Sequence, residues 1–93
     1  MKVGTIVIKF HVPWVQSLKE KRMIVKSISG KIKNKFNVSV AEVDSQDLHK
    51  IIVIGMAYVT TDAAQADSIL NNILNFIEMN TEAEVLDVEY EIM

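Results

Sequence analysis

The chain has no cysteine, one proline and three scattered glycines, and aromatic residues make up only 6% of it. Without cysteine, a disulfide framework and a thiolate metal site are both excluded. Without clustered glycines, a phosphate-cradling loop at a helix start is excluded as well. No apolar run approaches the roughly 20 residues that span a bilayer, and the N-terminus lacks the pattern of a signal peptide. We therefore expect a cytoplasmic protein that does not associate with a membrane.

What the chain does contain is apolar residues, which make up 49% of its 93 positions and exclude a disordered tail. The length falls within the usual size of one domain, about 50 to 250 residues. We expect a single domain over residues 1–93, able to fold alone or as an oligomer.

The net charge of −2 hides an uneven distribution of charge along the chain. Residues 1–41 hold nine Lys or Arg and one acid, whereas residues 42–93 hold one Lys and eleven acids. One explanation is that a basic face binds an anionic partner. The other is that two complementary halves of the chain pack together, and the composition favours neither.

Four segments have the composition and periodicity of β-strands: residues 3–12, 38–43, 50–60 and 84–93. In the first, the apolar side is expected to face the core, and Pro13 ends the strand. The third is apolar at nearly every position, which is typical of a strand covered on both sides. The last alternates cleanly and predicts a half-exposed strand with four inward residues, Leu86, Val88, Tyr90 and Ile92.

Two segments have the periodicity of amphipathic helices. The first begins after Ser17, which has capping-box spacing to Glu20, so each side chain is expected to bond the other residue's backbone amide. It runs to Lys35, where Asn34 or Asn37 can supply a left-handed stop.

The second helix is expected to begin at a cap formed by Thr61 or Asp62 and to end near Asn80. The order β-α-β-β-α-β is that of a ferredoxin-like α+β fold, with a four-stranded antiparallel sheet and two helices on one face. The first and last strands are neighbours in this topology. Lys9 and His11 are therefore expected opposite an acidic residue of the last strand, Asp87, Glu89 or Glu91.

The first helix carries seven of the ten basic residues, and four of them share the edge opposite its apolar side: Lys19, Arg22, Lys26 and Lys33. At 1.5 Å per residue they span about two dozen Å, which suits several phosphates along a nucleic-acid backbone. Gly30 lies on the same edge, although glycine inside a helix costs on the order of 1 kcal/mol relative to alanine. A closely approaching phosphate, a local bend or a tight packing contact would each explain it.

Two further residues are lesser candidates for contacts with nucleic acid. Lys21 falls at the apolar side of the helix, so we expect its stem to pack and its ammonium to reach solvent. Trp14 precedes the helix and is suited either to stack on an unpaired base or to pack on the helix as an N-terminal staple.

Two other classes of function are open. Val3, Val7 and alternate residues of 51–59 would leave apolar surface on the open sheet face, which favours a homodimer or a regulatory interaction module. A hydrolase or metal enzyme would use Glu42, Asp44 and His49, but no spacing of a known metal site or nucleophile–base pair is present. These acids are more typical of a solvated strand end. We expect no catalytic residue, no metal and no cofactor.

The motif Ser17-Leu18-Lys19-Glu20-Lys21-Arg22, followed by Asn37-Val38-Ser39-Val40-Ala41-Glu42-Val43, resembles the YlxP-like family of bacterial domains. Met1-Lys2-Val3-Gly4 and Asp47-Leu48 fit as well, whereas His49 stands where many members have tryptophan. The resemblance covers essentially the whole chain and implies a ferredoxin-like fold but no activity. Its members are often encoded beside translation-initiation and ribosome-maturation factors. This implies an accessory protein that binds RNA or a ribosomal particle.

Overall fold

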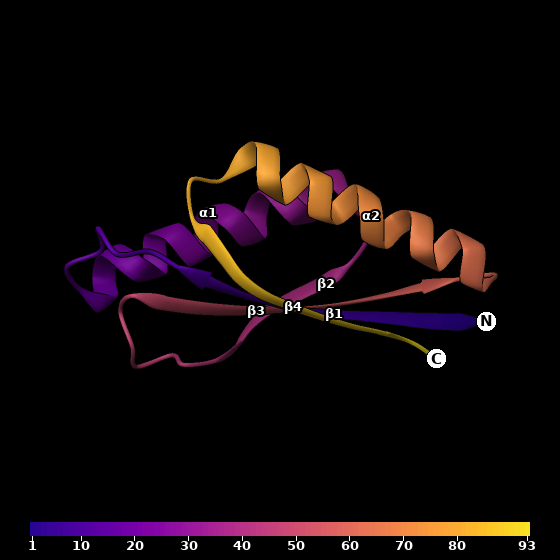
Figure 1. Cartoon of the computed structure of the whole chain (residues 1–93), viewed down its shortest axis with the longest axis horizontal. Helices are drawn as coiled ribbons and strands as arrows, with labels where there is room; N and C mark the ends of the chain where they lie inside the picture. Colours follow the sequence, from indigo (N-terminus) through magenta and orange to yellow (C-terminus); the bar gives the residue numbers. More distant parts are fainter.

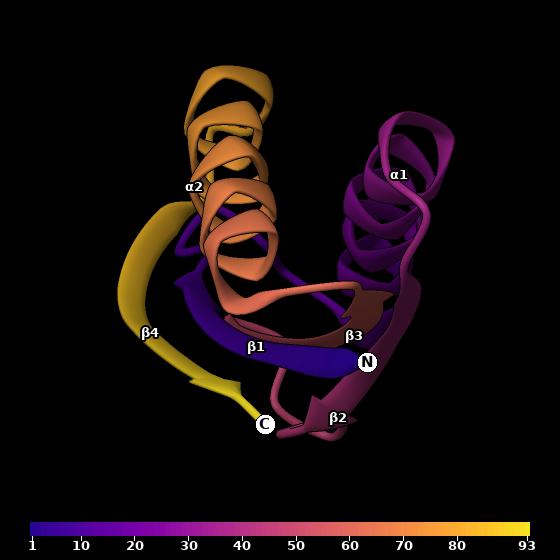
Figure 2. The same ribbon diagram turned by 90° about the vertical axis from the view of Figure 1, so that its right-hand side faces the viewer.

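The computed structural model describes all residues from 1 to 93, which form one sheet with two helices on one of its faces (Figures 1 and 2). In chain order the elements are β1 (Lys2–His11), α1 (Leu18–Lys35), β2 (Ser39–Asp44), β3 (Ile51–Thr60), α2 (Ala63–Asn80) and β4 (Glu84–Ile92). The strand order is β2-β3-β1-β4, and every neighbouring pair is antiparallel. The ferredoxin-like α+β fold expected from the sequence is confirmed.

The core lies between the helices and the two central strands, β1 and β3. Their ten residues pair in one continuous register, so the alternate residues of both strands face the same side. Ile6, Ile8 and Phe10 are fully buried there, as their alternation predicts. Burying a side chain of this kind contributes roughly 1.5–3 kcal/mol. The helices cover these residues with apolar stripes made of Ile28 and Ile32 from α1 and of Ala66, Leu70, Ile73 and Ile77 from α2.

A buried tyrosine explains the glycine at the start of β1. Gly4 pairs with Tyr58 across the sheet, and a Cβ at Gly4 would overlap the phenol ring. The Tyr58 hydroxyl donates a hydrogen bond of 2.8 Å to the carbonyl of Ala66 in α2. Burial, and secondarily the Asp67 carboxylate, raise the pKa of Tyr58 above its usual value. The hydroxyl therefore stays protonated and fixes the first turn of α2 to β3.

The start of α1 is capped nearly as predicted. The Ser17 hydroxyl accepts a hydrogen bond of 3.2 Å from the amide of Glu20. The Glu20 carboxylate does not bond the Ser17 amide, as a strict capping box requires, but accepts from the amide of Gln16 at 3.1 Å. The cap thus satisfies amides on both sides of Ser17.

The expected left-handed stop at Asn34 or Asn37 is wrong. α1 ends when Phe36 adopts an extended backbone with φ of −127°, and its amide still donates to the carbonyl of Ile32 at 2.8 Å. The Phe36 ring packs edge-on against Phe76 of α2, with ring centroids 5.5 Å apart. This contact holds the chain extended as it enters β2, so no left-handed residue is needed.

β4 pairs with β1 as expected, but a bulge changes which of its residues face inward. The register shifts between Lys9 and Phe10, so Val85 rather than Leu86 lies opposite Phe10. Val88 and Ile92 pack against the core as predicted. Leu86, beside the bulge, is exposed, and Tyr90 is exposed as well although it keeps the register opposite Ile6, so neither is the buried residue that was expected. Before the shift, Lys9 lies opposite Asp87, as predicted. After it, His11 lies opposite Glu84 rather than one of the three acids expected, with 3.4 Å between Nδ1 and Oε2.

Candidate nucleic-acid interface

The four basic residues predicted to share one edge of α1 are all exposed, and we call Lys19, Arg22, Lys26 and Lys33 the basic edge. The chain contains one ion pair, Lys21–Glu42, and one histidine–carboxylate pair, His11–Glu84, and neither involves the basic edge. Both pairs join the basic and acidic halves of the sequence, so the halves do pack together. Even so, the main concentration of positive charge is left facing solvent.

The fold also keeps the basic edge away from the acidic last strand. α1 packs on β2 and β3, whereas α2 packs on β1, β3 and β4. Figure 2 shows α1 and β4 on opposite sides of the molecule. Because exposed charges separated by more than about 10 Å are largely screened at 0.1 M salt, the acids of β4 do little to cancel the field at α1.

Gly30 has no packing role in the folded chain. No heavy atom lies within 4 Å of the position that a Cβ would occupy, and the helix continues through this residue without a positive φ. A tight packing contact, one of the three explanations for this glycine, is therefore excluded. An open strip of backbone lies beside Lys26 and Lys33 on the basic edge.

Lys21 is not at the surface, and the expectation that its ammonium reaches solvent is wrong. The residue is only 1% exposed, and Nζ lies 2.9 Å from Oε2 of Glu42. Nζ also donates hydrogen bonds of 2.6 Å to the carbonyls of Ser45 and Leu48. Since all its partners are internal, Lys21 is removed from the candidate interface.

Three of the four stretches that carry the family resemblance meet at Lys21. The lysine belongs to the first motif, Glu42 to the second, and Leu48 to the Asp47-Leu48 pair. Ser45 turns the chain between them in a left-handed conformation with φ of 54°, and its amide is bonded to the Asp44 carboxylate at 2.7 Å. These motifs therefore join α1 to β2 and to the loop after it, which gives them a structural role.

The carboxylates considered for catalysis do not form a site. Glu42 is mostly buried and is neutralised by Lys21, so the expectation of a solvated strand end is wrong for this residue. No group of three or more His, Asp or Glu side chains is arranged to hold a metal ion. The alternative of a metal enzyme around Glu42, Asp44 and His49 has no assembled ligand set behind it.

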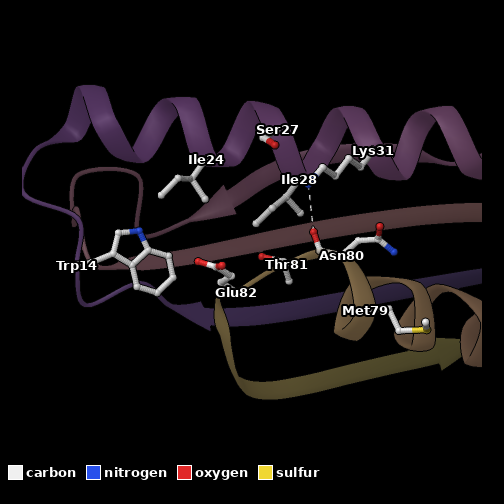
Figure 3. Close-up of a pocket in the computed structure, with 9 residues that line it drawn as sticks. All are labelled: Trp14, Ile24, Ser27, Ile28, Lys31, Met79, Asn80, Thr81 and Glu82. Carbon is white, nitrogen blue, oxygen red and sulfur yellow. Dashed lines mark hydrogen bonds between the residues drawn. The ribbon is translucent and has the colours of Figure 1, made fainter.

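Trp14 lies at one end of a cleft between α1 and the end of α2 (Figure 3). The residue is 44% exposed, and Val15 behind it is fully buried and anchors the connection. The cleft has a volume of about 600 Å³ and is lined by Trp14, Ile24, Ser27, Ile28, Lys31, Met79, Asn80, Thr81 and Glu82. The sequence singled out only Trp14 from this group, because the other residues come from two helices and a turn that are far apart in the chain.

Comparison with known proteins gives a family and a fold. The family described as "Protein of unknown function (DUF503)" matches residues 3–90. The uncharacterized protein YlxP of Bacillus subtilis (strain 168) is 40% identical over 68 residues, which cover 73% of this chain and 74% of that protein. The expected YlxP-like resemblance is confirmed.

Among solved structures, a mutant of SnoaB, a cofactor-independent oxygenase from Streptomyces nogalater, matches with a TM-score of 0.53 at 12% identity. The match covers 98% of this chain and 90% of SnoaB. At this identity the likeness concerns the fold alone. Neither helix of the present chain is long and apolar enough to cross a membrane.

The Lys21 contacts predict a large difference between two lysine substitutions on the same helix. Lys21→Met leaves the Glu42 carboxylate buried without its cation, so we expect the free energy of unfolding to fall by about 3–5 kcal/mol. The exposed Lys26→Met is the control and should change it by no more than about 0.5 kcal/mol. Urea denaturation of both variants measures the two values. Equal, small losses would contradict a structural role for Lys21.

Proposed function

The chain belongs to the DUF503 family, and we propose that it is a cytoplasmic accessory protein that binds RNA or a ribosomal particle through the basic edge of α1. In this proposal the protein has no catalytic role. Lys19, Arg22, Lys26 and Lys33 contact successive phosphates, and each contact releases counterions from the RNA.

The observation that carries the proposal is the set of four exposed cations that have no acidic partner within the chain. An ordinary surface helix mixes both signs of charge, whereas the only acid of α1, Glu20, is engaged in the cap. The neighbourhood of translation genes implied by the family resemblance supports RNA as the anion. The net charge of −2 does not oppose this, because binding responds to the local field.

The salt dependence of RNA binding tests the basic edge directly. Four phosphate contacts predict a slope of about −3 in a plot of log K against log salt, at about −0.7 per contact on a single strand. Replacing two of the four, by Lys26→Gln with Lys33→Gln, should bring the slope to about half that value. Fluorescence anisotropy of a labelled RNA strand over a range of salt concentrations measures both slopes.

A matched control removes the same charge elsewhere on the surface. Lys2 and Lys9 are exposed residues of β1, on the sheet rather than on α1. Lys2→Gln with Lys9→Gln should leave the slope unchanged. If this pair lowers the slope as much as the helix pair does, the basic edge is not the binding surface.

The open position beside Gly30 predicts opposite effects of one substitution on stability and on binding. Gly30→Ala adds a methyl group where nothing in the chain lies within 4 Å, so we expect the helix to gain up to about 1 kcal/mol. If an RNA phosphate approaches the backbone here, the same methyl group weakens RNA binding. Thermal unfolding and anisotropy measure the two effects. A stabilised variant with unchanged RNA affinity would show that no close approach occurs at Gly30.

We propose as a second function a homodimer formed through the open sheet face. Val7, Val43 and Val59 are exposed on this face, and Val59 is 64% accessible. Pairing at the sheet edges is disfavoured, because β2 is short and bulged and β4 carries alternating acids. Sedimentation at high concentration should then show a dimer that Val7→Lys with Val59→Lys dissociates. A strict monomer of the unmodified chain rules this function out.

A further inference from the structure

The cleft beside α1 has the size and lining of a ligand site. Its volume of about 600 Å³ lies within the usual range for such sites, about 300–1,000 Å³. One wall is apolar, formed by Ile24 and Ile28 of α1, and one end is the half-exposed indole of Trp14 (Figure 3). Thr81 and Glu82, from the turn after α2, add polar groups. A flat, partly polar molecule matches this combination of surfaces.

One ridge of α1 links the start of the basic edge with the cleft. On a helix, residues four apart lie next to one another in a ridge. The ridge of Lys19, Met23, Ser27 and Lys31 starts on the basic edge and ends in the cleft, where Ser27 and Lys31 belong to the lining. Met23, between Lys19 and Ser27 on this ridge, is strongly exposed. A strand bound at the Lys19 end of the basic edge can therefore reach the cleft along this ridge.

The charges in the cleft favour a neutral base over a phosphate. The Lys31 ammonium is already bound to the carbonyl of Asn80 at 3.1 Å, which also ties α1 to the end of α2. Glu82 is paired with no cation, and its carboxylate offsets the charge of Lys31 in the same cleft, so the cleft has no net positive charge to attract a phosphate. A carboxylate accepts well, however, from the exocyclic amino group of a base. Phosphates are thus directed to the basic edge and bases to the cleft.

We propose that this cleft binds one unpaired RNA base that carries an amino group, cytosine or adenine, stacked on Trp14 and donating to Glu82. This inference rests on the proposed function, because the basic edge holds the strand to which the base belongs. Contacts to phosphates alone do not distinguish one sequence from another. With a base bound in the cleft as well, the protein selects single-stranded RNA that carries a preferred base.

Trp14 is the only tryptophan of the chain, so its fluorescence reports on the cleft alone. Three single strands of equal length are titrated at one salt concentration: an oligocytidylate, an oligouridylate and an abasic strand. We expect the oligocytidylate to quench the emission and the abasic strand to bind without quenching. Oligouridylate has the same ring size but no amino group, and should bind roughly 5- to 150-fold more weakly than oligocytidylate.

Three variants test the stacking on Trp14 separately from the hydrogen bond to Glu82. Trp14→Ala should weaken oligocytidylate binding roughly 5- to 150-fold, measured by anisotropy, and leave the abasic strand unaffected. Trp14→Phe keeps an aromatic ring and should restore much of the affinity. Glu82→Gln, which can accept and also donate, should reduce the preference for cytosine over uracil while quenching persists.

The outcomes distinguish this inference from the proposed function. Binding of all three strands without quenching, and with equal affinity, overturns the cleft as a base site and leaves the basic edge in place. Equal affinity for oligocytidylate and oligouridylate, with quenching by both, overturns the role of Glu82. Failure of every strand to bind overturns both proposals. If Trp14→Ala does not fold, the titration of the unmodified chain decides alone.

Discussion

The buried contact between Lys21 and Glu42 is the interaction on which the arrangement of this molecule depends. Three internal oxygen partners hold one ammonium group, and they come from β2 and from the loop that leads to β3. A buried ion pair need not stabilise a protein more than an apolar pair would, but it tolerates few geometries. Here it fixes the rotation of α1 over the sheet. Once Lys21 points inward, the basic edge on the opposite side of the helix points to solvent.

This rotation separates the charges of the molecule into two regions. The basic edge lies on the α1 side of the fold, and the acids of β4 lie on the side covered by α2 (Figure 2). A chain of nearly neutral net charge can thereby present a strongly positive surface to an anion. The acidic last strand serves a second purpose, since charged residues on an edge strand disfavour pairing with another sheet.

The fold itself says little about function, because ferredoxin-like sheets host many unrelated activities. The oxygenase SnoaB shares the architecture at 12% identity. What distinguishes the present chain is local: an exposed row of cations, a glycine with empty space beside it, and a cleft with the single tryptophan at one end. The proposed binding of an extended anionic strand draws on all three features.

The sequence by itself determined the order of the elements, the cap at Ser17 and the basic edge, because each depends on a pattern within a short window. The period of two in a strand and of 3.6 in a helix determines which side of the element is apolar, and this does not depend on the elements that pack against it. The helical wheel also placed Lys21 correctly at the apolar side of α1. It gave no information about where the ammonium would go, since the carbonyls that bind it lie 24 and 27 residues further along the chain.

Only the tertiary structure decided the remaining features. The bulge opposite Lys9 reverses the side on which Leu86 was expected, because register depends on the pairing of two strands that are distant in sequence. Gly4 is needed because the Tyr58 ring lies above it. The cleft exists because the turn after α2 brings Glu82 close to α1. Local patterns specify the faces of each element, whereas contacts between distant residues determine which of those faces remain available to a partner.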